Sequence, residues 1–527
     1  MALGRRFGPT LAISVVLFCA AGLTGGHEEH DPNYWNHQAH ELLFEKKDYT
    51  MQKINIAKNI MVFVGAGMSP ATVTAARTFA GAENETFAFE KMKWSGNART
   101  YCVDSRVPDS ACAGTAFLTG VKSNLGTVAM HPTVKRGDCV ATSDKVKQLE
   151  SIAKWALDAG KVVGFATTSR VTAGSSAALY GHSADARWEN DADVTAAGCN
   201  PAEVRDIAYQ LIHGEVGKRF TVIFGGGRKN FIPSTATDAS GARGLRADGK
   251  NLIEEWKQSK TTGNAVYITT GAELAALDTS KIDHLLGLFD YDQLPYAADV
   301  GNGQNPDTPP LVRMVHYSLE MLQKKEHSNG FLLFVEDGNI LRAHQENKPN
   351  KAFQQVAHYS MAFDMGHMMV SETNSLVVSL NDVGSTLSLP GYPARDTDAL
   401  VSAGTSDQDS KPYLSVSYAT GPGFDSYYKL PEGRLDPVTV LQNAATPAKE
   451  RTCSASVPMT AGVNGGEDAM VYASGPWAFM LSGAYEQNFV AHAITFASCI
   501  TDVCGGASSV VLSAATVLLA IVVKLFA

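Results

Sequence analysis

Short apolar runs of strand length alternate with helical patterns along most of this chain, and this alternation restricts the fold more than any other feature. Strands are expected at residues 59–64, 161–168, 220–224, 330–335 and 375–380. Helices are expected between or beside them at residues 70–79, 145–157, 202–212, 311–325 and 350–365. A continuous apolar strand that feeds a helix is typical of a buried parallel sheet. The pattern predicts an α/β fold with a central, mostly parallel sheet and helices on both faces.

The composition is that of an ordinary globular protein. The chain has 527 residues, of which 45% are hydrophobic and 18% charged, so a large core is possible. The formal net charge is −9, and no cluster of basic residues is visible. Because binding to a phosphate backbone needs a basic face, the sequence argues against a nucleic-acid-binding protein.

Both ends of the chain are apolar. Arg5 and Arg6 precede an apolar run at residues 11–23 followed by small residues, which predicts a secretory signal peptide over residues 1–26. Small residues at 505–509 lead into an apolar tail, which predicts a signal for a glycosylphosphatidylinositol (GPI) anchor over residues 505–527. The polar spacer before the tail is nearly absent, so a retained membrane helix is the alternative. Residues 27–504 are expected to form the folded extracellular domain.

The cysteines indicate an oxidising compartment. Of the eight, Cys19 lies in the predicted signal peptide, which leaves an odd number in the mature chain. One thiol is therefore expected to be free, and Cys453 has no obvious local partner. A single sequon predicts that Asn84 carries a glycan if it is exposed.

The first candidate for chemistry is the serine of the sequence VPDSA at residues 107–111. Ser110 stands where a turn enters a run of small residues at 112–118, close to the backbone N–H groups that a helix start leaves unpaired. That position suits a nucleophile that handles anions. Serine and aspartate at a helix start are also common caps, so the stretch alone leaves both interpretations open.

In open α/β sheets, functional sites gather at the carboxyl ends of the strands. Four such ends stand out here, at residues 65–67, 225–227, 336–338 and 381–382. The sequence GGGRK at 225–229 lacks the spacing and the terminal Ser or Thr of a phosphate-binding loop, so a tight turn is expected there.

Several separated phrases together resemble the animal alkaline phosphatase family. In the family's order they are VPDSA at 107–111, SRV at 169–171, HSAD at 182–185, GGGRK at 225–229, LGLF at 286–289, GGED at 465–468 and EQN at 486–488. The resemblance covers about residues 31–504 and implies a homodimeric α/β protein with a signal peptide and a glycolipid anchor. It also implies hydrolysis of phosphate monoesters through a phosphoserine, with two zinc ions and one magnesium ion.

Most of the residues that carry this chemistry in the family are replaced here. Ser110 matches the nucleophile, and Ser175 and Glu336 match magnesium ligands. Ala66 matches an aspartate that bridges zinc and magnesium. The positions of the first zinc's ligands match Leu341, Gln345 and Asn464, and those of the second match Asn381 and Asp382. Ala186 matches the arginine that binds the phosphate, and Ala173 matches a histidine near the magnesium.

Zinc needs anionic or imidazole ligands at about 2.0–2.3 Å, and hydrocarbon or amide side chains do not supply them. His344 and Arg187 each lie one residue from a lost position and could replace it only after a local shift of the chain. Arg342 adds a positive charge beside Leu341, and His182 is expected to be structural. We therefore expect zinc and magnesium to be absent or incomplete, and Ser110 to be unactivated.

The sequence thus favours a catalytically inactive, GPI-anchored protein on the extracellular face of the plasma membrane. It would act by binding, or as a homodimer or a heterodimer with an active relative. In such a dimer, residues 33–44, with Tyr34 and Trp35, would reach the other subunit. The alternative is an active phosphatase that uses Ser110, Glu336 and a nearby acid such as Asp337 or Asp382.

The resemblance also implies two disulfides, Cys139–Cys199 and Cys499–Cys504. A third pair, Cys102–Cys112, is reasonable because both cysteines flank the turn of Ser110. The family has a calcium site built partly on a Phe-Glu pair. Here Phe289 and Asp290 match that pair and Asp292 is close, but the other acidic ligands are not evident, so calcium binding stays undecided.

Overall fold

A computed structural model describes residues 30–47, 53–80, 86–238, 240–301, 303, 305–324, 327–394, 397–429, 431–443 and 450–504. The predicted signal peptide, the sequon at Asn84 and the predicted anchor signal at residues 505–527 lie outside these residues. Among the described helices, none combines the length and the apolar character that a membrane span requires.

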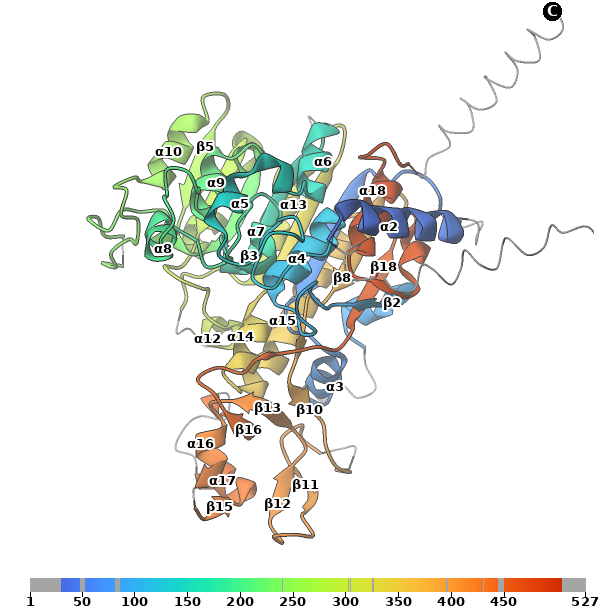
Figure 1. Ribbon diagram of the computed structural model, residues 1–527, viewed down its shortest axis with the longest axis vertical. Coiled ribbons are helices and arrows are strands. Elements are labelled where there is room, and N and C mark those ends of the chain that lie inside the picture. The colour runs from blue at the N-terminus through green and yellow to red at the C-terminus, as the bar shows by residue number, and fades with distance from the viewer. Residues whose placement is uncertain are drawn as a thin grey trace, which may run out of the picture.

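A ten-stranded sheet forms the centre of the molecule (Figure 1). In spatial order its strands are β19 (Gly483–Glu486), β2 (Trp94–Arg99), β18 (Ala469–Ser474), β8 (Ser375–Leu380), β1 (Asn59–Gly65), β7 (Phe331–Asp337), β3 (Val162–Arg170), β4 (Val222–Gly226), β6 (His284–Leu288) and β5 (Ala265–Ile268). Only β18 runs against its neighbours, and all other pairs in the sheet are parallel. The predicted mostly parallel sheet is confirmed.

Helices cover both faces because the central strands are apolar on both sides. In β1, Val62 and Val64 join one core cluster, whereas Met61 and Phe63 join the other. The first cluster is completed by α4 (Ser110–Thr119), α6 (Ile152–Asp158), α9 (Ile207–His213), α10 (Leu252–Ser259) and α18 (Phe489–Ser498). The second is completed by α3 (Pro70–Phe79), α13 (Leu311–Leu322), α14 (Asn339–Gln345) and α15 (Pro349–Met368).

Most predicted elements form within a few residues of their expected bounds, but two helices differ. The predicted helix at 145–157 is a 3-10 turn, η2 (Lys145–Lys147), followed by α6, because the Ser151 hydroxyl caps a new start by accepting from the N–H of Lys154. The predicted helix at 202–212 begins at residue 207, where the carboxylate of Asp206 accepts from the N–H of Tyr209. Asn200 and Pro201 therefore mark a turn and not the helix start.

The segment between β8 and β18 builds the narrow end of the molecule, at the bottom of Figure 1. Its elements are β9 (Gly384–Ser385), β10 (Leu387–Ser388), β11 (Ser402–Thr405), β12 (Pro412–Leu414), β13 (Ser417–Gly421), α16 (Phe424–Tyr427), β14 (Tyr428–Lys429), β15 (Gly433–Arg434), α17 (Pro437–Asn443), β16 (Ala455–Pro458) and β17 (Asn464–Gly465). The remaining helices are short connections: α5 (Cys139–Ser143), α7 (Gly174–Ala177), α8 (Asp191–Ala196), α11 (Gly271–Ala275) and α12 (Ala297–Gly301).

All three predicted disulfides are present, namely Cys102–Cys112, Cys139–Cys199 and Cys499–Cys504. Cys453 is free and buried, as expected from the odd cysteine count.

The segment proposed to reach a second subunit forms α2 (Pro32–Lys47), which packs against α18 of the same chain. The Trp35 side chain is only 1% exposed. That this segment reaches a second subunit stays a prediction; within its own chain the indole ring is buried because it is apolar and lies on the face of α2 that meets the core.

Candidate active site

The carboxyl ends of β1, β7 and β8 meet at one edge of the sheet, because β1 pairs in register with both neighbours. This brings together the residues that follow or end these strands, among them Ala66, Glu336 and Asp382, as the sequence predicts. Ser110 faces this edge as the first residue of α4.

Asp109, and not Ser110, caps α4. The Asp109 carboxylate accepts from the N–H of Cys112 at 2.9 Å, and the Cys102–Cys112 disulfide ties this first turn to the preceding loop. The Ser110 side chain is partly buried and lies beside the carboxyl of Asp382. The cap and the nucleophile position are therefore occupied by neighbouring residues.

Asp382 is buried beneath Ser110. Its Oδ1 accepts from the N–H groups of Gly67 at 3.1 Å and Val383 at 2.7 Å, whereas its Oδ2 has no hydrogen-bond partner among the described residues. Burial raises the pKa of Asp382 to about 7, the nearby Glu336 carboxylate adds to the rise, and the Ser110 hydroxyl opposes it. One oxygen of the Asp382 carboxyl group is thus hydrogen-bonded to the backbone, and the other has no hydrogen-bond partner among the described residues.

Hydroxyl groups saturate the carboxylate of Glu336. It accepts from Ser175 Oγ at 2.8 Å, from Ser176 Oγ at 2.8 Å and from Thr167 Oγ1 at 2.7 Å. Burial raises the pKa of Glu336. The two predicted magnesium-site residues, Ser175 and Glu336, do lie together, but they bind each other.

Hydrocarbon stands at two positions that the resemblance assigns to metal ligands. Leu341 lies on α14 against Gly67, whose φ of +73° is in the left-handed region. A β-carbon on Gly67 would lie 2.8 Å from Cδ1 of Leu341. Ala66, the neighbouring lost position, is buried. Neither side chain has an atom that can bind a metal.

The other two positions of the first zinc site are amides that contact each other. Gln345 Nε2 donates to Asn464 Oδ1 at 3.5 Å, and Asn464 Nδ2 donates to the carbonyl of Pro108 at 3.0 Å. Asn464 therefore supports the turn that leads to Ser110, and its contacts replace metal coordination with hydrogen bonds.

Asn381, which the resemblance assigns to the second zinc, is a hydrogen-bonded amide. Asn381 Nδ2 donates to the carbonyl of Val383 at 3.1 Å, and Asn381 Oδ1 accepts from the N–H of Met470 at 2.8 Å. Both ends of the Asn381 amide are thus used by the backbone. Asp337, the other acid considered as a catalytic group, accepts from Thr168 Oγ1 at 2.9 Å and from Gln355 Nε2 at 2.8 Å.

The residues considered as replacements are engaged elsewhere. His344 is buried between Thr72 Oγ1 at 3.0 Å and the Tyr418 hydroxyl at 2.9 Å, and burial lowers its pKa to about 3. Arg187 pairs with Asp185 at 2.7 Å. His182 is structural, since its Nε2 bonds to the carbonyl of Leu149.

The arginine and histidine positions of the family are filled by small side chains. Ala186 is partly buried, and its N–H donates to the carbonyl of Gly126 at 2.8 Å. Ala173 precedes α7 and gives it no side-chain cap. A methyl group at either position cannot grip an anion.

Within the described part of the chain, one group of three or more His, Cys, Asp or Glu ligand atoms lies within 4.8 Å, and it consists of Cys102, Asp109 and Cys112. Its two sulfurs form a disulfide, so only a carboxylate is left. The donors present at the strand edge therefore do not fit a pair of zinc ions.

The candidate calcium residues are also paired within the chain. The Asp292 carboxylate contacts Arg170 at 3.2 Å and Lys229 at 2.9 Å, and Asp290 Oδ1 accepts from the N–H of Asp292 at 3.0 Å. Sequence reasoning missed Thr167 and Ser176 as partners of Glu336. Their hydroxyls near the end of β3 and in the Ser-Ser pair of α7 were the available signal.

Comparisons with known proteins identify the family and match the fold. The family model described as alkaline phosphatase matches residues 57–500. The chain is similar to the membrane-bound alkaline phosphatase of Bombyx mori, with 37% identity over 94% of this chain and 90% of that protein. It is also similar to the tissue-nonspecific alkaline phosphatase of Rattus norvegicus, with 37% identity over 92% of each. A variant of the TAB5 alkaline phosphatase, solved with magnesium bound, has a TM-score of 0.57 at 16% identity, covering 84% of this chain and 99% of that one.

Proposed function

Because the chain belongs to the alkaline phosphatase family, we propose that it is a cell-surface member that keeps the scaffold but lacks the two-zinc phosphatase activity. On this proposal it acts through binding or through pairing with another subunit. The observation that carries the proposal is the side-chain chemistry at the strand edge, where Leu341 meets Gly67 and Gln345 meets Asn464.

Phosphoryl transfer in a two-metal site depends on clamping the attacking and leaving oxygens and on lowering the pKa of a bound water. The family's metal positions offer hydrocarbon at Ala66 and Leu341 and hydrogen-bonded amides at Asn381 and Asn464. Without a bound cation, Ser110 is an ordinary alcohol with a pKa far above neutrality. The chain supplies no arginine at position 186 to hold a phosphate.

The cell-surface part of the proposal rests on the ends of the sequence and on the disulfides. Three disulfides favour an oxidising compartment. The relative from Bombyx mori is described as membrane-bound. We further propose that a GPI anchor is added within residues 505–509. We also propose that the protein forms a homodimer, or a heterodimer with an active relative.

The test is an assay of the ectodomain, residues 27–504, with p-nitrophenyl phosphate in excess zinc and magnesium. We expect the turnover of the wild-type protein to equal that of Ser110→Ala, with a commercial alkaline phosphatase as the positive control. Turnover that requires Ser110 and is lost on chelation would overturn the proposal.

One observation favours a second function, a phosphatase that does not use zinc. Asp382 Oδ2 is buried and has no hydrogen-bond partner among the described residues, and the Asp382 carboxyl interacts with the Ser110 side chain. A carboxylate in that position could accept the proton of the serine hydroxyl. This candidate predicts turnover that survives chelation and disappears in both Ser110→Ala and Asp382→Asn.

A further inference from the structure

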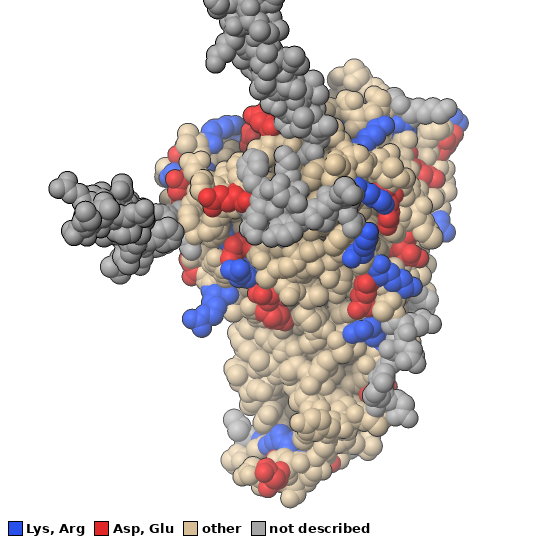
Figure 2. Space-filling view, turned by 90° about the vertical axis from the view of Figure 1, so that its right-hand side faces the viewer, with Lys and Arg blue, Asp and Glu red and all other residues tan. Residues whose placement is uncertain are grey.

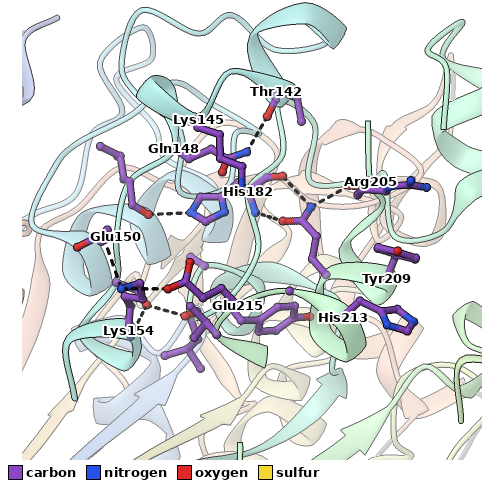
Figure 3. A pocket seen from close by; sticks show the side chains of 18 of the residues that line it. Thr142, Lys145, Gln148, Glu150, Lys154, His182, Arg205, Tyr209, His213 and Glu215 are labelled. Atoms are coloured by element: carbon purple, nitrogen blue, oxygen red, sulfur yellow. Dashed lines mark hydrogen bonds and ion pairs between the residues drawn. The ribbon is translucent and has the colours of Figure 1, made fainter. Parts of the chain in front are cut away.

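A cavity of about 420 Å³ lies on the face of the sheet that is covered by α6 and α9 (Figure 3). None of its lining residues belongs to the candidate active site. Its walls come from η2, α6, α9 and the loop that carries His182. The volume is in the lower part of the range for small-molecule sites. Its lining identifies the class of ligand.

One wall is a strip of flat groups on α9 and in the turn before it. The guanidinium carbon of Arg205 lies 4.8 Å from the ring centroid of Tyr209, and the Tyr209 and His213 rings lie 4.5 Å apart. His213 is fixed by Glu255, with 2.6 Å between Nε2 and Oε2. Tyr209 and His213 are four residues apart on α9 and share one side of the helix, whereas Arg205 precedes it. The three flat groups stack in a row and form a preorganised wall.

The charges around the cavity balance. Three basic side chains, Lys145, Lys154 and Arg205, face three acidic ones, Glu150, Glu203 and Glu215. Lys154 pairs with Asp158 and also with Glu150 at 3.8 Å and Glu215 at 3.3 Å, so its charge is already compensated within the chain (Figure 3). A ligand with a net charge would therefore gain little electrostatic energy here.

The cavity lining has hydrogen-bond donors and acceptors that the described part of the protein does not itself use. His182 Nε2 bonds to the carbonyl of Leu149 at 2.9 Å, so Nε2 carries the proton and Nδ1 is an acceptor, and burial lowers the pKa of this histidine. Among the described residues, the Tyr209 hydroxyl and the Lys145 ammonium group have no hydrogen-bond or ion-pair partner. A matching ligand must both donate and accept.

We propose that this cavity binds a neutral saccharide. Each sugar hydroxyl both donates and accepts, and the C–H groups of a pyranose ring can pack against the row of flat side chains formed by Arg205, Tyr209 and His213. A phosphate or sulfate group only accepts and would meet Glu203 and Glu215. An ammonium compound only donates and would meet Lys145 and Arg205. The ligand could be a free sugar or the terminal sugar of a neutral glycan on a neighbouring glycoprotein.

The test is saturation-transfer NMR on the ectodomain, residues 27–504, with methyl β-D-galactopyranoside, methyl α-D-mannopyranoside and N-acetylglucosamine. A released neutral N-glycan forms a separate arm, which distinguishes a free sugar from a glycan. We expect transfer to at least one of these probes. Methyl phosphate and tetramethylammonium, whose methyl protons can be observed, serve as charged probes and should show none.

We expect Tyr209→Ala to weaken the binding about tenfold, because the central ring of the wall is lost. Glu215→Gln, at an exposed position, should weaken it without affecting the fold. Tyr392→Ala is the matched control, since that tyrosine is 97% exposed at the other end of the molecule. The proposal fails if none of the saccharides binds, if both cavity variants bind like the wild type, or if a charged probe binds in their place. Phosphatase activity does not enter the readout, so this test is independent of the proposed function.

Discussion

Leu341 packs against Gly67 at the carboxyl end of β1, where a β-carbon on the glycine would lie 2.8 Å from Leu341 Cδ1. The resemblance in sequence assigns position 341 to an aspartate that would bind zinc. An apolar side chain in close contact with the glycine leaves neither a donor nor space for a hydrated ion. Side-chain packing and amide hydrogen bonds thus stabilise this edge of the sheet, and the predictions below test that arrangement.

Asn381 should act as a structural amide. In Asn381→Asp, a carboxylate oxygen would replace the NH₂ group that donates to the Val383 carbonyl, and the two oxygens would repel each other in a buried site. We expect a loss of roughly 2–4 kcal/mol in the free energy of unfolding, measured in urea at pH 7.5 with and without zinc. Asn264→Asp, at an exposed amide that donates to the Lys281 carbonyl, should change it by less than about 1 kcal/mol. A stabilisation of Asn381→Asp by zinc would contradict the account.

Asp382 should make the protein less stable as the pH rises. Its pKa in the folded chain is about 7, above the unfolded value of 3.8, so the folded state holds a proton that the unfolded state has lost. The stability contributed by the protonated acid is complete below pH 4 and is lost as the pH rises towards 7. Relative to the wild type, Asp382→Asn should therefore gain roughly 2 kcal/mol between pH 5 and pH 8 in urea unfolding.

Asp409→Asn is the control for this pH dependence. The salt bridge and hydrogen bond with Arg434 lower the pKa of Asp409 to about 2, so its charge does not change between pH 5 and pH 8. The difference between Asp409→Asn and the wild type should stay constant over this range. A flat difference for Asp382→Asn as well would show that Asp382 is ionised in the folded protein.

The Cys102–Cys112 disulfide should hold the start of α4 in place. Replacing both cysteines by serine opens a loop with a sequence separation of 10 and should lower the free energy of unfolding by about 2–3 kcal/mol. Hydrogen exchange of the backbone amides at residues 107–119 should increase in this double variant. The Cys499–Cys504 double variant, which opens a shorter loop far along the chain, should leave exchange at 107–119 unchanged. Equal exchange in both variants would refute this role.

His344 should contribute to stability and not to metal binding. Its ring joins Thr72 of α3 to Tyr418 of β13, so His344→Ala leaves two buried hydroxyl groups without this partner. The expected cost is roughly 2–4 kcal/mol, the same in the presence of zinc or of a chelator. His316→Ala, at a more exposed histidine, should cost less than about 1 kcal/mol. A cost that appears only when zinc is present would identify His344 as a ligand.

The sheet could be predicted because residues 59–64 are apolar on both sides, a pattern that only a strand covered on both faces needs. The start of α9 could not be predicted. The pair Asn200-Pro201 and the residue Asp206 are equally good local signals for a helix start, and in the structure the helix begins after Asp206. The positions of the candidate site came from the resemblance. The contact between Gln345 and Asn464 joins residues 119 apart in sequence, and no local pattern encodes it.

The central claim is that the side chains at the family's zinc positions no longer hold zinc. Elemental analysis of the full ectodomain, expressed in zinc-supplemented medium and purified without chelators, tests it most directly. A variant that restores the six ligands, with Ala66→Asp, Leu341→Asp, Gln345→His, Asn381→Asp, Asp382→His and Asn464→His, is the positive comparison. We predict less than about 0.1 zinc per wild-type chain after dialysis, because Asp382 is the single carboxylate among the six positions and the others offer hydrocarbon or amide groups. A content of about two zinc ions per wild-type chain, as a complete two-metal site holds, would contradict the account.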